Sequence, residues 1–223
     1  MRIFTDANLR FSLKEAAVLS GLSENKLRRE VERKVIVPRQ APTGATHRLE
    51  FVESEILYFA MLNSFAGKLE LTPQTRTKAW RLLIDWSHKA AVERTKRWTS
   101  IHRDNRLRSR WVISLDRRWA KTISPIVTVN WDALLEDVGP RVDLYGRGRE
   151  RIHEDEAILG GEPVFKGTRL SVRHIGRMRA KGESVERIIE DYPNLSAEDV
   201  EFARLYAEAH PVVGRPSASA ATA

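Results

Sequence analysis

The chain has no cysteine among its 223 residues. Disulfide frameworks, cysteine-ligated zinc sites and thiol nucleophiles are therefore excluded. The sequence also lacks any apolar run of about 18 residues, the length that would predict a membrane-spanning helix. Residues Met1–Asp6 lack the apolar core of a secretory signal. Together these absences lead us to expect a cytoplasmic protein without a membrane partner.

Catalytic and cofactor motifs are missing as well. The sequence contains no glycine-rich phosphate loop, no dinucleotide fingerprint and no serine-hydrolase elbow. None of the six histidines has metal-ligand spacing to another histidine. We therefore expect no enzymatic activity, no cofactor and no metal site, and look instead for a binding function.

Positive charge is concentrated in the middle of the chain. The formal net charge is +8, of which residues 1–65 carry +2, residues 66–150 carry +8 and residues 151–223 carry −2. A basic surface attracts nucleic acid because binding releases the counterions condensed on the phosphates. The front and the middle of the chain therefore favour a nucleic acid, whereas the slightly acidic rear favours another kind of partner.

The first 65 residues predict a helix, a turn, a second helix, a two-stranded hairpin and a third helix. Ser12 followed by Glu15 matches a capping box, and Gly21 supplies the turn between the helices. Ser23 is placed to cap the second helix. The elements predicted after Gly21 are the helix Glu24–Lys34, the strands Val35–Pro38 and His47–Phe51, and the helix Glu53–Phe65.

This order of elements resembles the DNA-binding domain of MerR-type regulators and excisionases, a winged helix-turn-helix. The resemblance assigns residues 1–66 to such a domain and implies that the second helix enters the major groove while the hairpin, or wing, follows the DNA backbone. The candidate DNA-binding residues are Ser23, Asn25, Lys26, Arg28, Arg29 and Arg48. A plain helical pair with lysine and arginine on its surface is the alternative interpretation.

Residues 67–150 form a basic, tryptophan-rich middle region. Thr72-Pro73 predicts the start of a long helix, since threonine caps and proline suits the first helical position. Arginines then alternate with tryptophans, which is typical either of nucleic-acid binding or of a tryptophan core with a solvated arginine shell. The later predicted elements are strands at Val112–Leu115 and Ile126–Val129, a short helix at Trp131–Val138 and a flexible connection at Gly146–Gly148.

The stretch from Gly160 onwards predicts a short hairpin that turns at Gly167, followed by three helices. Each helix has a serine at its expected start, and the third serine is followed by an aspartate in a capping-box position. The predicted helices are Val172–Lys181 after Ser171, Val185–Asp191 after Ser184, and Ala197–His210 after Ser196 with Asp199. The expected fold class is mainly α with small β-hairpins: an N-terminal winged helix-turn-helix and a C-terminal three-helix, helix-turn-helix-like domain.

Many residues of this stretch also fit one family pattern at fixed spacing. They are Gly160, Gly161, Pro163, Gly167, Thr168, Arg169, Val172, Gly182, Ser184, Tyr192, Pro193, Leu195, Asp199 and Val200. The pattern resembles the antitoxin domain of VapB-like proteins from VapBC-like toxin–antitoxin pairs. The whole chain resembles the longer members of that family, which carry a DNA-binding domain in front.

The resemblance implies an antitoxin of a type II pair that represses its own operon. Residues 151–211 would bind a PIN-like ribonuclease toxin, and the front domain would bind operator DNA as a homodimer or within a larger hetero-oligomer. The acidic helix Ala197–His210 is a poor match to a DNA groove and a better match to a basic protein surface. Residues 212–223 are expected to be a flexible tail, in which Arg215 is a candidate to pair with carboxylates of the toxin.

Two other functions stay open at this point. In the first, the chain is a stand-alone transcription regulator or recombination accessory factor, and its C-terminal unit only dimerises. In the second, the arginines and tryptophans of the middle region bind RNA. A small nuclease reading frame next to this one would favour the antitoxin, and competition between duplex DNA and RNA would identify an RNA-binding protein.

Overall fold

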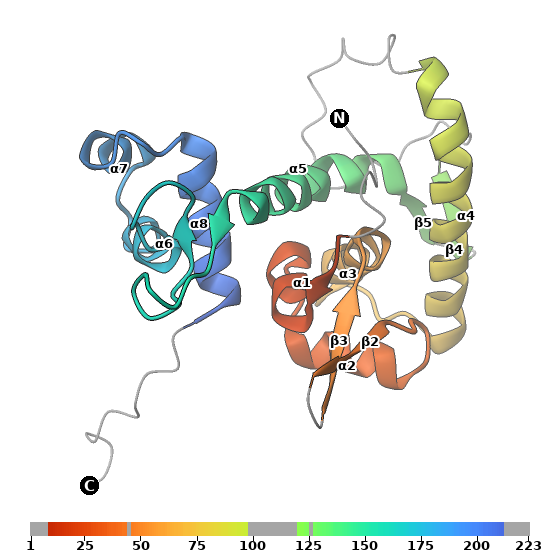
Figure 1. The fold of residues 1–223 in the computed structure, drawn as a ribbon. Coiled ribbons are helices and arrows are strands. Elements are labelled where there is room, and N and C mark those ends of the chain that lie inside the picture. The colour runs from red at the N-terminus through yellow and green to blue at the C-terminus, as the bar shows by residue number, and fades with distance from the viewer. Residues whose placement is uncertain (1–8, 44–45, 98–119, 125–126, 212–223) are drawn as a thin grey trace, which may run out of the picture. The chain divides into compact units, whose positions relative to one another are not determined.

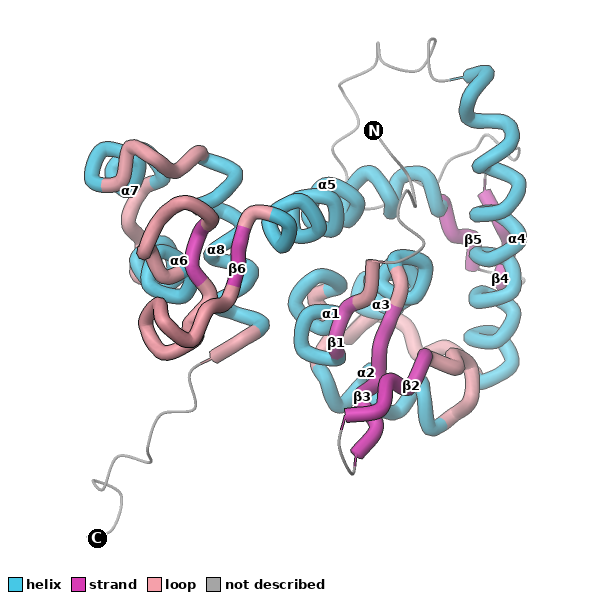
Figure 2. Tube along the Cα trace, in the orientation of Figure 1, coloured by secondary structure: helices cyan, strands magenta, loops and turns pink. Residues whose placement is uncertain are grey.

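The structure is a computed structural model that describes residues 9–43, 46–97, 120–124 and 127–211 (Figure 1). Helices predominate in these residues, and the strands are short (Figure 2). All the strand pairs of the described residues are antiparallel. The helices are α1 (Leu13–Ser20), α2 (Glu24–Glu32), α3 (Glu53–Phe65), α4 (Pro73–Arg97), α5 (Trp131–Glu150), α6 (Val172–Ala180), α7 (Val185–Asp191) and α8 (Ala197–Ala209). The strands are β1 (Phe11–Ser12), β2 (Arg39–Thr43), β3 (Thr46–Phe51), β4 (Ala120–Ser124), β5 (Val127–Asn130), β6 (Ile152–His153) and β7 (Val164–Phe165).

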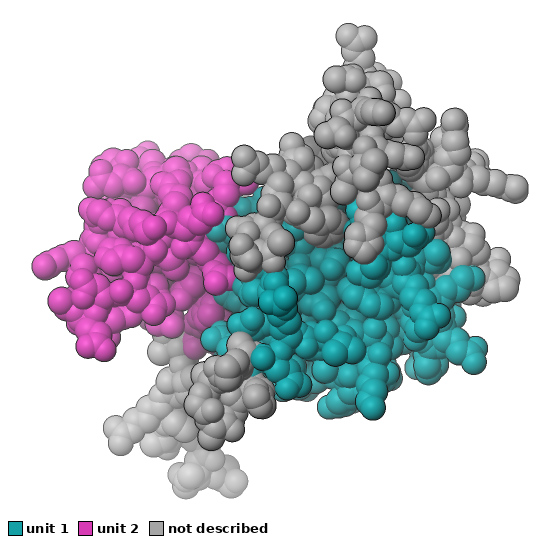
Figure 3. Space-filling view, turned by 45° about the vertical axis from the view of Figure 1, so that its right-hand side comes forward, with its two compact units in different colours: residues 1–146 teal, residues 147–223 magenta. Residues whose placement is uncertain are grey.

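Chain contacts divide the protein into two compact units, residues 1–146 and residues 147–223 (Figure 3). The mainly helical class with small antiparallel sheets is the one expected from the sequence. In the described part of the chain, no helix combines the length and the apolar character needed to cross a membrane.

A three-stranded antiparallel sheet, ordered β1-β3-β2, lies beside α1 and α3 in the first unit. Phe11 of β1 pairs with Phe51 of β3, and both side chains are fully buried. The Phe51 ring meets the Phe59 ring of α3 edge to face, with centroids 5.5 Å apart. These aromatic contacts build the core because such rings bury large apolar areas in a favoured geometry.

The predicted helix starts at the front of the chain are largely confirmed. The Ser12 backbone nitrogen donates to Glu15 Oε2 at 2.6 Å, and the Glu15 nitrogen donates to Ser12 Oγ at 3.4 Å. Gly21 ends α1 with a φ of +73°, a backbone region that glycine adopts without steric cost. α2 begins directly after Ser23, but the Ser23 side chain forms no capping hydrogen bond.

The predicted long helix at Thr72-Pro73 is also present, as α4. The Thr75 backbone nitrogen donates to the Thr72 hydroxyl at 3.2 Å, which caps the helix start. One face of α4 is buried at Ala79, and the Trp80 ring meets the Tyr58 ring of α3 edge to face at 5.6 Å. α4 therefore packs against α3 over its first turns.

The strand predicted at Val35–Pro38 is wrong. The chain leaves α2 through Lys34, whose φ is +56°, and continues without regular structure until β2 begins at Arg39. Val35 and Ile36 are buried while Val37 is exposed. Apolar β-branched residues form a strand only where a neighbouring strand can pair with them. Here the pairing with β3 begins at Arg39, which lies opposite Glu50 and follows Pro38 directly.

The prediction for α5 is wrong in its length. The helix was expected to end at Val138, yet it continues through Pro140 to Glu150, so the flexible connection expected at Gly146–Gly148 is helical. A Cβ at Gly148 would lie 2.1 Å from ring atoms of Phe202, so the absence of a side chain lets that ring pack on the helix. Glycine has a low helix propensity, and for that reason the sequence predicted a connection here. The packing of the Phe202 ring offsets this low propensity.

The remaining predictions for the middle region have different outcomes. The strand expected at Ile126–Val129 corresponds to β5, Val127–Asn130, which pairs with β4. The strand expected at Val112–Leu115 and the arginine- and tryptophan-rich segment 98–119 lie outside the described residues.

The three helices predicted for the second unit are confirmed, with ends within one residue of those expected. The hydroxyls of Ser171 and Ser184 accept backbone hydrogen bonds three residues on, at 3.2 and 3.1 Å. Ser196 and Asp199 form the expected capping box at the start of α8. α6 and α8 cross closely at Gly176. A Cβ at this position would lie 2.2 Å from the Ala203 carbonyl oxygen of α8, so the crossing leaves no room for a side chain.

The predicted hairpin at Gly167 is only partly present. Gly167 makes the turn with a φ of +76°, and one isolated bridge joins Val164 to Ser171. The strand that pairs with β7 is β6, whose residue Ile152 lies opposite Phe165. β6 is not among the strands predicted from the sequence, since a two-residue strand carries no periodic pattern.

Candidate nucleic-acid interface

The predicted DNA-binding residues of α2 lie on its exposed side. Leu27 and Glu30 are buried and hold the helix against the first unit. The residues that the sequence singled out here are all exposed: Ser23, Asn25, Lys26, Arg28 and Arg29. Successive residues of an α-helix are rotated by about 100° around its axis, so Leu27 and Glu30, three residues apart, lie on the same face. Because that face is buried, the opposite face is open to solvent.

Positions around the helix divide the exposed residues further. Asn25 and Arg29 are four residues apart and share the middle of the exposed face, opposite Leu27. Arg28 lies to one side of that middle and Lys26 to the other. A surface that approached α2 head-on would therefore meet Asn25 and Arg29 first and the other two cations at its flanks.

These side chains have no partner within the described part of the chain. The side chains of Asn25, Lys26, Arg28 and Arg29 form neither a hydrogen bond nor an ion pair with any residue described there. By contrast, Arg33 on the same helix pairs with Glu30 at 2.7 Å. The cations of the exposed face are therefore available to an external anion without first breaking an internal pair.

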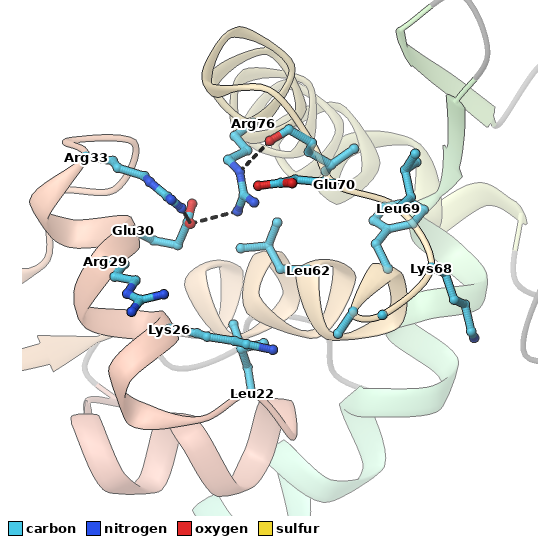
Figure 4. A pocket seen from close by; sticks show the side chains of 14 residues that line it. Leu22, Lys26, Arg29, Glu30, Arg33, Leu62, Lys68, Leu69, Glu70 and Arg76 are labelled. Atoms are coloured by element: carbon cyan, nitrogen blue, oxygen red, sulfur yellow. Dashed lines mark hydrogen bonds and ion pairs between the residues drawn. The ribbon is translucent and has the colours of Figure 1, made fainter.

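Glu30 fixes α2 to two other helices, a role that the sequence analysis missed. Its carboxylate lies 2.7 Å from Nη1 of Arg33 and 2.7 Å from Nη1 of Arg76, the latter on α4 (Figure 4). The Tyr58 hydroxyl of α3 donates to the other carboxylate oxygen at 3.0 Å. Glu30 is only 2% exposed, so these partners replace its lost hydration. The available signal was its place three residues after Leu27, on the buried face.

Tyr58 is kept neutral by the same arrangement. Burial raises the pKa of the Tyr58 hydroxyl far above its usual value, and the negative charge of Glu30 raises it further. A neutral hydroxyl is the form that donates a hydrogen bond to a carboxylate. The contact between Tyr58 and Glu30 therefore persists throughout the physiological pH range.

A groove of about 480 Å³ runs beside this ion cluster (Figure 4). Its apolar lining comes from the turn before α2, from α3 and from the turn that leads to α4, and includes Leu22, Leu62 and Leu71. Lys26 and Arg29 line the groove as well as belonging to the exposed face of α2. The positive surface of α2 thus continues onto the groove.

The other predicted contact residues lie elsewhere. Arg48 of β3 pairs in register with Ala41 of β2, and its side chain is exposed. Arg215 lies outside the described residues. The structure therefore brings together five of the predicted residues at α2, with Arg48 on the strand pair that follows α2.

The acidic helix α8 has a property that its sequence did not reveal. Each of its carboxylates is ion-paired: Glu198 with Arg147, Asp199 with Arg151, Glu201 with Arg179 and Arg204, and Glu208 with Arg204. Burial alone would raise the pKa of Glu201, but hydrogen bonds from Arg179 and Arg204 outweigh it and lower that pKa. The negative charge of α8 is thus largely compensated inside the second unit.

No cluster of three or more histidine, aspartate or glutamate side chains suited to a metal ion occurs among the residues that the structure describes.

Comparisons with known proteins place similarity along both units. Residues 152–207 match the family model described as "Protein of unknown function (DUF433)". Over 202 residues the chain is 29% identical to "Uncharacterized protein y4eO" of Sinorhizobium fredii. The aligned region covers 90% of this chain and 81% of that protein. Among solved structures, the X-ray crystal structure of Rv2018 from Mycobacterium tuberculosis covers 87% of this chain and 96% of its own, with a TM-score of 0.38 and 16% identity.

Proposed function

We propose that this chain is a DNA-binding antitoxin that represses its own operon and neutralises a PIN-like ribonuclease by direct contact. The observation that carries the DNA-binding part is the exposed face of α2, where Lys26, Arg28 and Arg29 have no side-chain partner among the residues that the structure describes. Helices α1 and α2, the strand pair β2–β3 and α3 follow one another in the order of a winged helix-turn-helix. In this proposal α2 is the recognition helix and β2–β3 is the wing.

The chemistry of the exposed face suits a major groove, which is wide enough to admit a helix. Asn25 and Arg29, in the middle of the face, would reach base edges, since asparagine pairs well with adenine and arginine with guanine. Lys26 and Arg28 at the flanks would contact phosphates or guanine edges. Ser23, whose hydroxyl caps nothing, and Arg48 on the wing would bind the backbone.

A homodimer, alone or within a larger assembly with the toxin, is the expected DNA-binding form. One small module buries a limited area on DNA, whereas two modules read half-sites spaced about one helical turn apart. The operator of this protein is therefore expected to contain two related half-sites.

The second unit would supply the contact with the toxin. This part of the proposal rests on the residue pattern of 151–211, which resembles the antitoxin domain of VapB-like proteins. Because the carboxylates of α8 are already ion-paired, a basic toxin surface would have to exchange partners with Arg147, Arg151 or Arg204. Arg215 in the tail is the proposed partner for carboxylates of the toxin.

Operator binding by the full chain tests the DNA-binding part. Arg28→Ala should weaken binding of the chain's own promoter duplex by about 1–3 kcal/mol if the guanidinium is bidentate to a base. Lys78→Ala, which removes an exposed cation from α4, is the matched control and should leave affinity unchanged. A loss below about 0.5 kcal/mol for Arg28→Ala would place Arg28 outside the interface.

Co-purification tests the antitoxin part. The full chain, expressed with the product of an adjacent small nuclease gene, should hold that product through ion-exchange and size-exclusion steps. Deletion of residues 212–223 should weaken the complex if Arg215 contributes. Operator binding without any co-purifying nuclease would leave the stand-alone regulator as the function.

A further inference from the structure

Charge is sharply segregated within the second unit. Residues 160–181 contain six basic side chains and one acidic side chain, whereas residues 182–210 contain two basic and eight acidic ones. The small net charge of the unit therefore hides a strongly positive segment, which contains α6, and a strongly negative one, which contains α7 and α8.

The two segments also differ in how their cations are used. Arg187 pairs with Glu190 and Asp191, and Arg204 pairs with Glu201 and Glu208. In the positive segment, five cations form no ion pair with any residue that the structure describes: Lys166, Arg169, Arg173, Arg177 and Lys181. The acidic side chain of that segment, Glu162, accepts a hydrogen bond from the Ser171 hydroxyl at 2.6 Å.

Three of the unpaired cations form a row along α6. Arg173 and Arg177 of α6 and Lys181, the residue that caps its C-terminus, are four residues apart, so they lie on one side of the helix with a rise of about 6 Å between successive residues. The opposite side is buried through Ile175 and Gly176, the latter against the backbone of α8. We call these three residues the α6 row.

Two residues of the α6 row lie at the surface of the unit, and the third lies partly within it. Arg177 and Lys181 are exposed, and Arg173 is half-buried with its Nε lacking any hydrogen-bond partner. Arg179, by contrast, is drawn to α8 by Glu201 at 2.8 Å. The row thus consists of cations that form no ion pair within the described part of the chain.

We propose that the α6 row binds the phosphate backbone of a nucleic acid. A linear series of like charges, spaced by about 6 Å, suits a polymer that carries one negative charge per repeating unit. A protein partner would more often find an apolar centre surrounded by polar groups. The exposed large hydrophobic residues of the described chain are Val37, Leu69 and Leu159, and none belongs to α6.

This inference goes beyond the proposed function, which gives the second unit a protein partner alone. It also differs from the expectation that the slightly acidic rear of the chain favours a partner other than nucleic acid. The polyanion would bind α6 rather than α8. The second unit would then add sequence-independent affinity to whatever the first unit reads.

The salt dependence of binding by the full chain tests the proposal. The variant Arg173→Ala/Arg177→Ala/Lys181→Ala removes the row. The variant Arg147→Ala/Arg187→Ala/Arg204→Ala removes three ion-paired cations of the same unit and changes the net charge equally. Both are titrated with labelled duplex DNA and with duplex RNA between about 50 and 200 mM salt.

The row variant should bind at least one duplex less tightly and with a flatter salt dependence. Each lost phosphate contact lowers the slope of log K against log salt by about 0.9, so three contacts lower it by about 2.7. The ion-paired control should keep the wild-type slope. Loss on DNA alone or on RNA alone identifies which nucleic acid the row binds.

Two results would overturn the proposal. One is a row variant whose affinity and slope match the wild type on both duplexes while its thermal unfolding is unchanged. The other is displacement of both duplexes by poly-glutamate at equal charge, which would indicate an acidic protein partner. The variant Arg28→Ala/Arg29→Ala is measured in parallel to separate the two proposals. If this variant binds the duplexes less tightly and the row variant binds them normally, the α6 row is rejected as a nucleic-acid site and α2 is not. If only the row variant binds less tightly, α2 is rejected and the α6 row is not.

Discussion

The carboxylate of Glu30 lies 2.7 Å from the guanidinium of Arg76, which follows it by 46 residues in the chain. This contact joins α2 to α4, and the hydrogen bond from Tyr58 adds α3 to the same cluster. The buried side of α2 thus carries a neutralised acid, while the cations of its exposed side form no ion pair with any residue described in the structure. The orientation of the exposed face depends on this cluster, since Glu30 sets the rotation of α2 about its axis.

Breaking the cluster should destabilise the first unit. Arg76→Ala leaves the Glu30 carboxylate buried with Arg33 as its remaining cation, and Arg33 is itself 44% exposed. Loss of one partner of a buried ion pair typically costs about 3–5 kcal/mol, and the remaining partner should reduce this to about 2–3 kcal/mol. Urea unfolding measures the loss. Arg81→Ala, an exposed cation on the same helix, should change stability by less than about 0.5 kcal/mol.

The turn at Gly21 should not tolerate a side chain. Its φ is +73°, and an added Cβ would lie 2.8 Å from Nδ2 of Asn63. Gly21→Ala should therefore destabilise the chain by about 1–2 kcal/mol from backbone strain, with a further cost for the contact. Gly67 has the same φ, and nothing lies within 4 Å of a Cβ added there. Gly67→Ala therefore measures the cost of backbone strain without the cost of a close contact. Equal losses at both positions would show that Asn63 moves aside freely.

The helix starts could be predicted from the sequence because capping is local. Ser12 with Glu15, and Ser196 with Asp199, bond across three residues and need no other part of the chain. The exposed face of α2 followed from helical periodicity for the same reason. Ser23 shows the limit of this reasoning, since a serine in the capping position fixes the helix boundary without forming the hydrogen bond.

The errors arose where distant residues decide the structure. α5 continues through Gly148 because the Phe202 ring packs there, 54 residues further along the chain. Val35–Pro38 has strand-forming residues, but the register of β3 starts its pairing at Arg39. The role of Glu30 likewise depends on Arg76, which no local pattern connects to it.

The crossing of α6 and α8 gives a third prediction. A Cβ at Gly176 would lie 2.2 Å from the Ala203 carbonyl oxygen, and a backbone atom cannot swing away. Gly176→Ala should therefore separate the two helices and cost about 2–4 kcal/mol, although alanine favours the helix itself by about 1 kcal/mol. Gly146→Ala is the matched control, because its nearest neighbour is the tip of the flexible Leu9 side chain at 3.0 Å. A stable Gly176→Ala variant with an unchanged melting temperature would contradict the close crossing.

Glu55 in the first turn of α3 gives the stability of the first unit a distinct pH dependence. Burial raises the pKa of the Glu55 carboxyl to about 7, although the hydrogen bond from the Val52 nitrogen and the charge of Arg10 act in the opposite direction. In the unfolded chain a glutamate titrates near 4.3. The folded state therefore binds this proton more tightly than the unfolded state does.

The sign of the effect follows from this difference in proton affinity. The stabilisation from Glu55 is fully present below about pH 4, where both states are protonated, and is lost as the pH rises from about 4 to about 7. The loss is on the order of 3 kcal/mol. Glu55→Gln keeps a neutral group of the same shape, with an oxygen that still accepts from the Val52 nitrogen, and removes the titration.

Urea unfolding of the wild type and Glu55→Gln at a series of pH values between about 4.5 and 8 checks this prediction. The stability of the variant relative to the wild type should increase steadily with pH and level off above about pH 7. Taking the difference between the two proteins cancels the histidines and other groups that titrate in the same range. Glu32→Gln, which removes an exposed carboxylate from α2, is the control for the loss of one negative charge. A constant difference for Glu55→Gln would mean that Glu55 is ionised in the folded state at neutral pH, so that Arg10 and the helix start outweigh its burial.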